Sequence, residues 1–377
     1  MQRPPARGML AVLMSLLAVA ALAVVISAST GATRPSSDAP STPSTPSSPE
    51  AGERVTRPSG GADRPPKGVV TLAFAGDMHF ELHLSELLDR PEGALGGITR
   101  TLRAADLTMV NLESAITTRG APDEPDDYSF RTSPRALDVL DRAGVDVIGL
   151  ANNHSVDYGA VGLADTLRAV RGSPAPVVGI GRDARAAYRP HRVSVRGTDL
   201  AFFAANTKRE RTSRRWAAGP DSPGIATAVD GRPRQLLRAV RSASRRDDVV
   251  VVYLHWGTES ESCPGPKQRV LARALAEAGA DVVVGSHAHE LQGSGWVGDT
   301  YVNYGLGNFL WYHNQRSESG VLQVRIVDGA VAGDAFVPAR IETYGRPRVL
   351  TGPGARAAVA DWRSLRGCAG LAPRPAS

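Results

Sequence analysis

The sequence predicts an α/β protein, because short apolar runs typical of β-strands alternate with helical patterns along most of the chain. Two of these runs, 248–254 and 281–284, are almost continuously apolar, as in strands that are buried on both faces. Beyond residue 300 strand-like runs predominate, and Asp328-Gly329 has the composition of a hairpin turn. Ligands of such proteins bind beyond the carboxyl ends of the strands, so polar residues just after each strand form the candidate site.

Each element is predicted from its own local signals. Strands are expected where β-forming residues run together or alternate with polar ones, over 69–74, 107–110, 145–150, 176–180, 191–195, 200–204, 248–254, 281–284, 300–304, 321–327 and 331–337. Helices are expected where apolar residues recur at helical spacing, over 84–89, 97–104, 134–143, 161–171, 232–244 and 267–278. Gly144 ends one helix, and the Pro- and Asp-rich stretch 121–127 is expected to be an irregular loop.

The first 66 residues differ from the rest of the chain in composition. Residues 8–26 form an uncharged apolar run after Arg3 and Arg7, which indicates a signal peptide or an N-terminal membrane anchor within residues 1–29. Residues 30–66 are mainly Pro, Ser, Thr and Ala, a composition typical of a disordered linker. We therefore expect an extracytoplasmic protein, either secreted or tethered to the outer face of the cytoplasmic membrane.

The folded domain is expected to cover residues 67–345, followed by a C-terminal tail, 346–377, to which the sequence assigns no structure beyond one helical fragment. Two cysteines, Cys263 and Cys368, could pair outside the cytoplasm, and they are too few for a zinc site built on cysteine. The net charge of +6 favours an anionic partner such as an envelope polymer, and nucleic acid is not expected. The basic cluster 208–216 fits either a solvated loop or a loop that contacts substrate.

Five successive strands are followed by residues that bind metal ions or transfer protons. Five of the eight histidines lie on these strand ends, namely His79, His154, His255, His287 and His289. Carboxylates and amides on the same ends complete the set, namely Asp77, Glu113, Asn153 and Asp157. Asp77 and His79 are two residues apart, so on an extended strand end both side chains point to one face. His287 and His289 have the same spacing.

These ligand types predict the chemistry of the site. Carboxylate, imidazole and amide oxygen without thiolate favour a hydrolytic divalent metal such as Mn, Fe or Zn. The candidates are numerous enough to hold two ions with one bridging carboxylate, the arrangement of two-metal hydrolases. His154, next to the candidate ligand Asn153, is expected to protonate the leaving group.

The motifs at the strand ends together resemble the bacterial capsule synthesis proteins of the CapA type, associated with poly-γ-glutamate. The motifs are Gly76-Asp77-x-His79, Asn111-Leu112-Glu113, Asn152-Asn153-His154 with Asp157-Tyr158-Gly159, His255-Trp256-Gly257-x-Glu259, Gly285-Ser286-His287-x-His289 and Tyr304-Gly305-Leu306-Gly307-Asn308-Phe309. The resemblance extends from about Val69 to about Val337. That family looks like a branch of the calcineurin-like metallophosphoesterases, which generally have Asp where this chain has Glu113.

The resemblance implies a four-layer α/β/β/α sandwich of the metallo-dependent phosphatase type and assigns roles to the site residues. It implies that one metal is held by Asp77, His79, Glu113 and His289, and the other by Glu113, Asn153, His255 and His287. His154 would be the catalytic acid and Asp157 would orient it. Trp256, Glu259 and Asn308 match family motifs and are candidates for contact with substrate, although Trp256 also fits a cleft wall or a core position.

The function expected from these features is that of a metal-dependent hydrolase acting in the synthesis, release or anchoring of an anionic envelope polymer, poly-γ-glutamate by the resemblance. The bond cleaved is either a phosphoester or a γ-glutamyl amide. Two alternatives stay open, a secreted phosphoesterase unrelated to capsule and a non-catalytic polymer-binding assembly factor. Because the chain carries no polymer-synthesis module of its own, membrane-bound synthesis proteins are expected as partners.

Overall fold

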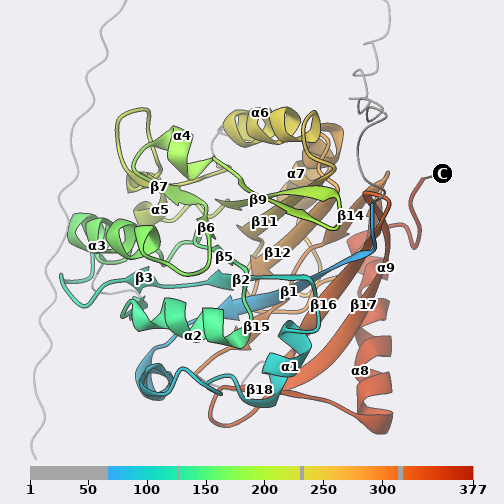
Figure 1. The fold of residues 1–377 in the computed structure, drawn as a ribbon, viewed down its shortest axis with the longest axis horizontal. Coiled ribbons are helices and arrows are strands. Elements are labelled where there is room, and N and C mark those ends of the chain that lie inside the picture. Colours follow the sequence, from blue (N-terminus) through green and yellow to red (C-terminus); the bar gives the residue numbers. More distant parts are fainter. Residues whose placement is uncertain (1–66, 125–127, 230–232, 313–316, 377) are drawn as a thin grey trace, which may run out of the picture. The chain divides into compact units, whose positions relative to one another are not determined.

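The computed structural model describes residues 67–124, 128–229, 233–312 and 317–376 (Figure 1). The expected signal peptide or anchor and the linker, residues 1–66, lie outside them. Within the described part of the chain, no helix combines the length and apolar character needed to span a bilayer.

Two large β-sheets carry the fold. The first has eight strands within the described residues, in the order β18 (Pro347–Val349), β17 (Ala330–Ile341), β16 (Glu318–Val327), β1 (Val70–Met78), β2 (Leu107–Leu112), β5 (Val147–Gly149) and β6 (Val177–Val178), with β15 (Asn308–Leu310) pairing β1. The second has the order β13 (Ser294–Val297), β14 (Thr300–Asn303), β12 (Val282–His287), β11 (Val249–Trp256), β9 (Thr198–Asn206) and β8 (His191–Val195). Two short pairs join β3 (Ala115–Ile116) to β4 (Arg131–Thr132) and β7 (Ile180–Gly181) to β10 (Gly224–Ile225).

Helices cover the outer face of each sheet (Figure 1). One core cluster joins the first sheet to η1 (Leu82–Asp89), η2 (Gly96–Ile98), α1 (Thr99–Leu102), α2 (Arg135–Ala143) and α3 (Gly159–Arg171). Another joins the second sheet to α4 (Ala184–Ala187), α6 (Pro233–Ser244) and α7 (Pro266–Glu277). A third lies between the sheets and contains Phe74, Phe202 and Leu322. The predicted four-layer α/β/β/α sandwich is confirmed, because three apolar layers separate four layers of structure.

Most strands form where the apolar runs predict them, and the difference at 176–180 has a physical cause. This run divides into β6, which joins the first sheet, and β7, which pairs β10. Gly179 lies between them with φ of +92°, and a Cβ there would be 2.5 Å from the Cβ of Ala151. The chain therefore turns at the glycine and leaves the sheet.

Residues 346–377, expected as a tail, contain β18, α8 (Gly352–Ser364) and α9 (Arg366–Ala369). Trp362 of α8 is buried and stacks on Phe336 of β17, with ring centroids 4.6 Å apart. Beyond α9, the backbone of Ala372 exchanges two hydrogen bonds with Trp296 of β13, of 2.9 and 3.1 Å. A disulfide joins Cys263, in the loop after β11, to Cys368 of α9.

Strand register brings distant polar residues together at the carboxyl ends of the strands. Asp77 of β1 pairs in register with Asn111 of β2 and Asn308 of β15. In the second sheet, Trp256 of β11 lies opposite His287 of β12. Both sheets thus deliver their strand ends to one edge of the sandwich.

Gly76 permits a close approach of β1 to the loop before β15. A Cβ at this position would lie 2.0 Å from the carbonyl oxygen of Gly307, which accepts a hydrogen bond from the backbone of Asp77. We expect Gly76→Ala to lower the free energy of unfolding by about 1–3 kcal/mol, because backbone must move to make room. Urea unfolding tests this against Gly97→Ala, where nothing lies within 4 Å of the added methyl group. Equal stability of the two variants would contradict the expectation.

Candidate metal centre

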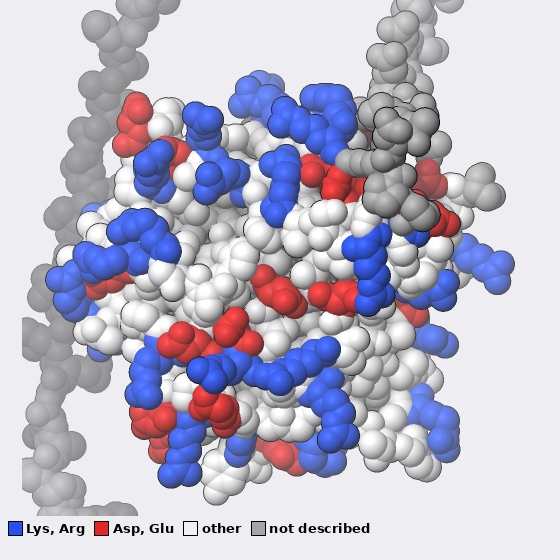
Figure 2. All heavy atoms as spheres, viewed as in Figure 1, with Lys and Arg blue, Asp and Glu red and all other residues white. Residues whose placement is uncertain are grey.

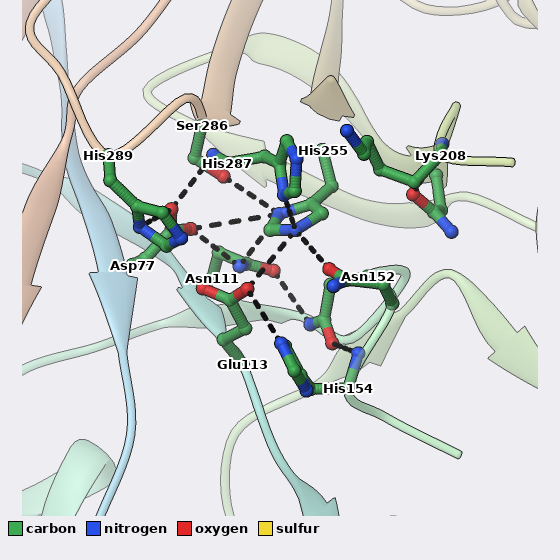
Figure 3. A network of polar contacts seen from close by, with 12 residues as sticks. Asp77, Asn111, Glu113, Asn152, His154, Lys208, His255, Ser286, His287 and His289 are labelled. Atoms are coloured by element: carbon green, nitrogen blue, oxygen red, sulfur yellow. Dashed lines mark hydrogen bonds and ion pairs between the residues drawn. The ribbon is translucent and has the colours of Figure 1, made fainter. Parts of the chain in front are cut away.

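The carboxylate of Asp77 is held at the end of β1 by groups from two other strands (Figure 3). The Asn111 side-chain amide donates to Asp77 Oδ1 at 2.7 Å, and the backbone N–H of His287 donates to Asp77 Oδ2 at 2.8 Å. Asn111 is fixed in turn by Asn152, whose amide donates to Asn111 Oδ1 at 3.0 Å. The orientation of Asp77 is therefore determined before any ligand binds.

Glu113 is fully buried, yet neither of its carboxylate oxygens has a hydrogen-bond partner within the described residues. Its Oε1 lies 3.3 Å from Nε2 of His255 and 3.8 Å from Nε2 of His154. No Lys or Arg among the described residues forms an ion pair with Glu113 or with Asp77. Because a buried carboxylate without a hydrogen bond is costly, this position favours a bound cation.

The histidines of the second sheet face this carboxylate. His255 Nε2 is 2.6 Å from Asn153 Oδ1 and 3.0 Å from His287 Nδ1, and all three residues are buried. His287 Nε2 has no hydrogen-bond partner in the described structure. His287 and His289 both have positive φ, +88° and +56°. Such strained backbone is concentrated at functional sites, where it orients side chains.

His289 is oriented by Asn308. Its Nδ1 lies 2.7 Å from Asn308 Oδ1, and because an amide oxygen can only accept, this nitrogen carries the proton. In the neutral ring this tautomer leaves the lone pair on Nε2, as a metal ligand requires. Asn308, expected at the substrate, thus contacts a candidate ligand in the structure.

The structure groups the candidate ligands into two sets that share Glu113. One set is Asp77, Glu113 and His255, and the other is Glu113, His287 and His289, with the ligand atoms of each within 4.8 Å of one another. The donor types, carboxylate and imidazole, suit a divalent transition metal. The unpartnered atoms of Glu113 and His287 show that these residues fit such an ion.

Burial sets the protonation of this cluster. It raises the pKa of Asp77 and of Glu113, and for Asp77 the charge of Glu113 adds to the effect. Burial also lowers the pKa of His255 to about 3 and that of His287 well below its ordinary value. The imidazoles are consequently neutral at pH 7 and present lone pairs, which is the form that binds metal.

His79 lies outside both sets. It is buried among aromatic rings, with centroids 4.4 Å from Trp311, 4.5 Å from Tyr312 and 4.8 Å from Phe130. Its Nδ1 accepts from the backbone N–H of Glu81 at 3.1 Å. The structure therefore places His79 in neither ligand set, although it follows Asp77 by only two residues.

His154 is paired with Asp157 next to the metal sets. His154 Nδ1 is 2.7 Å from Asp157 Oδ2, and the backbone N–H of Phe130 donates to the same oxygen at 2.8 Å. Burial alone would lower the pKa of His154, but the charge of Asp157, the hydrogen bond to it and the charge of Glu113 raise this pKa to about 9. His154 thus carries a proton at Nε2, directed at the site (Figure 3).

This pKa predicts a titration in metal-free protein. We expect the His154 imidazole to titrate near pH 9 by NMR, whereas Asp157→Asn should lower this pKa, because it removes the charge and the hydrogen bond that raise it most. Because folding raises the pKa of His154, protonation of this imidazole stabilises the folded state. The contribution is fully present below pH 6.5 and is lost as the pH rises through about 9. His191, whose pKa is lowered by burial, provides an internal control. A His154 titration below pH 6.5 in the wild type would contradict the pairing.

A cavity of about 250 Å³ opens beside His154. Its lining comprises Glu124, Tyr128, Ser129, Asn153, His154, Asp157, Glu210 and Glu259. The expected substrate residue Glu259 has a side chain 60% exposed, with Oε1 3.8 Å from His287 Nε2. Trp256, also expected at the substrate, is instead buried in the core of the second sheet and donates to the carbonyl of Tyr304 at 2.7 Å.

Several residues of the site are assigned no role by the sequence. Asn111 and Asn152 stand within the motifs, but their positioning contacts depend on strand register. From the basic cluster, Lys208 reaches the carbonyl of Gly257 at 3.3 Å, and the half-buried Glu210 hydrogen-bonds Asn153. Part of the basic cluster therefore faces the site. The one sequence feature that could have indicated this is its mixture of basic and acidic residues.

Comparisons with known proteins show which family this chain is similar to. Residues 71–313 match the family described as bacterial capsule synthesis protein PGA_cap. The chain is 27% identical over 277 residues to the PGA biosynthesis protein CapA of Bacillus subtilis (strain 168), covering 69% of this chain and 72% of that protein. It is 28% identical over 296 residues to the capsule biosynthesis protein CapA of Bacillus anthracis, covering 75% and 70%. Among solved structures, a hypothetical protein from Thermus thermophilus has a TM-score of 0.47 at 16% identity, over 72% of this chain and 99% of that one.

Proposed function

This chain belongs to the bacterial capsule synthesis protein family PGA_cap, and from that premise we propose that it is a metal-dependent hydrolase acting on an anionic envelope polymer. Membership of this family, together with its CapA relatives, supports a role in capsule or poly-glutamate biosynthesis. We propose poly-γ-glutamate as the polymer and a γ-glutamyl amide or a phosphoester as the bond that is cleaved. The reaction serves the synthesis, release or anchoring of the polymer.

One observation carries the hydrolase proposal. Glu113 is buried without a hydrogen-bond partner among the described residues and belongs to both candidate ligand sets, and its Oε1 lies 3.8 Å from Nε2 of the protonated His154. Bound divalent ions would polarise a carbonyl or phosphoryl oxygen and lower the pKa of water. Asp77, His255, His287 and His289 would hold them together with Glu113, and Asn153 Oδ1, 2.6 Å from His255, is placed to assist.

The protein's own groups account for the proton and for substrate position. His154 holds a proton at Nε2 for the leaving group. Its other ring nitrogen, Nδ1, is hydrogen-bonded to Asp157. The cavity next to His154 would admit the leaving group, and the charge of Lys208, which acts on Glu113, would favour an anionic substrate at the metal centre. His154 is only 14% exposed in its side chain, which limits proton loss to water.

We also propose that the protein works outside the cytoplasm, secreted or held by an N-terminal anchor, with membrane-bound polymer synthesis proteins as partners. Its described cysteines are joined in a disulfide, which persists in oxidising compartments. The apolar run 8–26 supports the same location.

The test measures metal content and hydrolysis together on the full chain purified with Mn. Substrates are p-nitrophenyl phosphate, bis-p-nitrophenyl phosphate and poly-γ-glutamate, with Asn153→Ala and His154→Ala as controls. Metal binding with turnover that Asn153→Ala loses supports the hydrolase, the substrate turned over identifies the bond, and His154→Ala should lose turnover of poly-γ-glutamate if that is the substrate. Metal binding without turnover would favour an assembly factor, and absence of metal would overturn the ligand assignment.

A further inference from the structure

The outer face of α6 and the turn that follows it carries a stripe of arginines. Residues 233–246 contain five arginines and no Asp or Glu. Four of them, Arg234, Arg238, Arg241 and Arg245, follow one another at intervals of four, three and four residues, which places them along one side of the helix. We call these four residues the arginine stripe.

The opposite side of α6 explains why the stripe faces outward. Leu236, Val240 and Ala243 are fully buried in the core of the second sheet. Arg234, Arg238 and Arg245 are exposed, and Arg241 is half-buried. Figure 2 shows Lys and Arg gathered along the edge of the molecule where α6 lies in Figure 1.

The arginines of the stripe have no acidic partners within the described structure. Nine arginines elsewhere do form ion pairs with Asp or Glu, namely Arg119, Arg135, Arg142, Arg168, Arg182, Arg192, Arg196, Arg215 and Arg348. No member of the stripe forms such a pair with a described residue. Neighbouring α7 adds exposed Lys267 and Arg273 to the same layer. The accumulated positive charge is therefore not neutralised within the described structure.

We propose that the arginine stripe binds a segment of an anionic polymer chain through its repeated carboxylates. Arginine binds carboxylates through two parallel hydrogen bonds, which suits a chain with one carboxylate in every repeat. The stripe extends over about 16 Å, at 1.5 Å per residue, so it contacts several repeats at once. The identity of the polymer, poly-γ-glutamate, rests on the proposed function, but the binding does not require hydrolysis.

The position of α6 relates the stripe to the metal centre. α6 is followed after a short turn by β11, which runs in the opposite direction and carries His255 near its carboxyl end. The first turn of α6 therefore lies toward the strand ends that form the site. A polymer bound along the stripe would be held on the same molecule while another part of it reaches the centre, which raises its local concentration there.

A polymer fits this face better than a membrane surface does. Helices that lie on membranes combine basic residues with an exposed apolar face that enters the lipid. The apolar side of α6 is instead packed against the second sheet, and residues 233–246 contain no aromatic residue. The stripe therefore offers charge without the apolar contact that a lipid surface needs.

The test compares the full chain with the variant Arg234→Gln, Arg238→Gln, Arg241→Gln and Arg245→Gln. Binding of size-fractionated poly-γ-glutamate is measured over a series of salt concentrations. We expect the variant to lose at least about tenfold in affinity and to show a weaker salt dependence, because fewer counterions are released. A matched control, Arg135→Gln, Arg142→Gln, Arg168→Gln and Arg348→Gln, removes the same charge elsewhere and should lose much less.

Further measurements keep the outcomes distinct. Replacing the four stripe arginines by Lys retains the charge but removes the two-bond geometry, so we expect an intermediate affinity. The unfolding temperature, the metal content and the rate of p-nitrophenyl phosphate hydrolysis should be the same in the stripe variant and in the wild type. Equal losses of affinity for poly-γ-glutamate in the stripe variant and in the control would overturn the proposal. So would a stripe variant that binds the polymer normally but binds phosphatidylglycerol vesicles more weakly than the wild type, which would identify a lipid surface instead.

Discussion

Glu113→Gln is expected to abolish divalent-metal binding while leaving the metal-free protein folded. Glu113 belongs to both ligand sets, so the neutral amide removes the shared charge from each of them. Changes to residues that merely support metal ligands cost about 10–100-fold in affinity, so a shared ligand should cost more than about 100-fold. Metal content after dialysis against a defined Mn concentration measures this directly.

Glu113→Gln should also differ from the wild type in how Mn affects its unfolding temperature. The wild-type carboxylate is buried without a hydrogen-bond partner in the described structure, and the variant loses its attraction to His154 but no hydrogen bond, so the replacement should change the stability of the metal-free fold little. Added Mn should raise the unfolding temperature of the wild type but not of the variant, because ligand binding stabilises only the state that binds. Glu124→Gln, on the cavity wall but outside both ligand sets, is the control. Full metal content in Glu113→Gln would contradict the shared-ligand assignment.

His154→Asn is expected to lower kcat by about 10²–10⁴-fold, the usual contribution of a general acid, without changing metal content. The reason is that Nε2 of His154 supplies the proton to the leaving group, and Asn cannot. The loss should depend on the leaving group. It should be large for phenyl phosphate and small for p-nitrophenyl phosphate, whose leaving group departs without a proton.

Asp157→Asn separates orientation from proton donation. It keeps the imidazole but removes the charge 2.7 Å from Nδ1, so kcat should fall less than in His154→Asn and decline at lower pH than in the wild type. Asp123→Asn alters a nearby carboxylate that pairs with Arg215 and serves as control. Equal losses on both phenyl substrates in His154→Asn would show that His154 is not the acid.

Much of this site was predictable from sequence because its polar, metal-binding residues follow the predicted strands. Residues such as Asp77 and His287 directly follow apolar runs, and parallel strands necessarily bring their carboxyl ends to one edge. Periodicity likewise predicted the hairpin of β16 and β17 at Asp328-Gly329. These features depend on local sequence and on general rules of sheet construction.

The remaining features depend on contacts between distant segments. His79 has the same local pattern as His287, but its environment is set by Phe130 and Trp311, about 50 and 230 residues further along the chain. Likewise, Lys208 reaches the site only because β9 and β11 are neighbours. No spacing within a single segment encodes such contacts.

The backbone pairing of Ala372 with Trp296 has a consequence for association between copies of this chain. β13 is the outermost strand of the second sheet, and the outer edge of such a strand can pair with a strand of another molecule. The segment after α9 covers that edge with its own hydrogen bonds and is tied in place through Cys368. Shortening the chain before Cys368 would thus expose the outer edge of β13 to pairing with another molecule. The segment after α9 therefore limits aggregation.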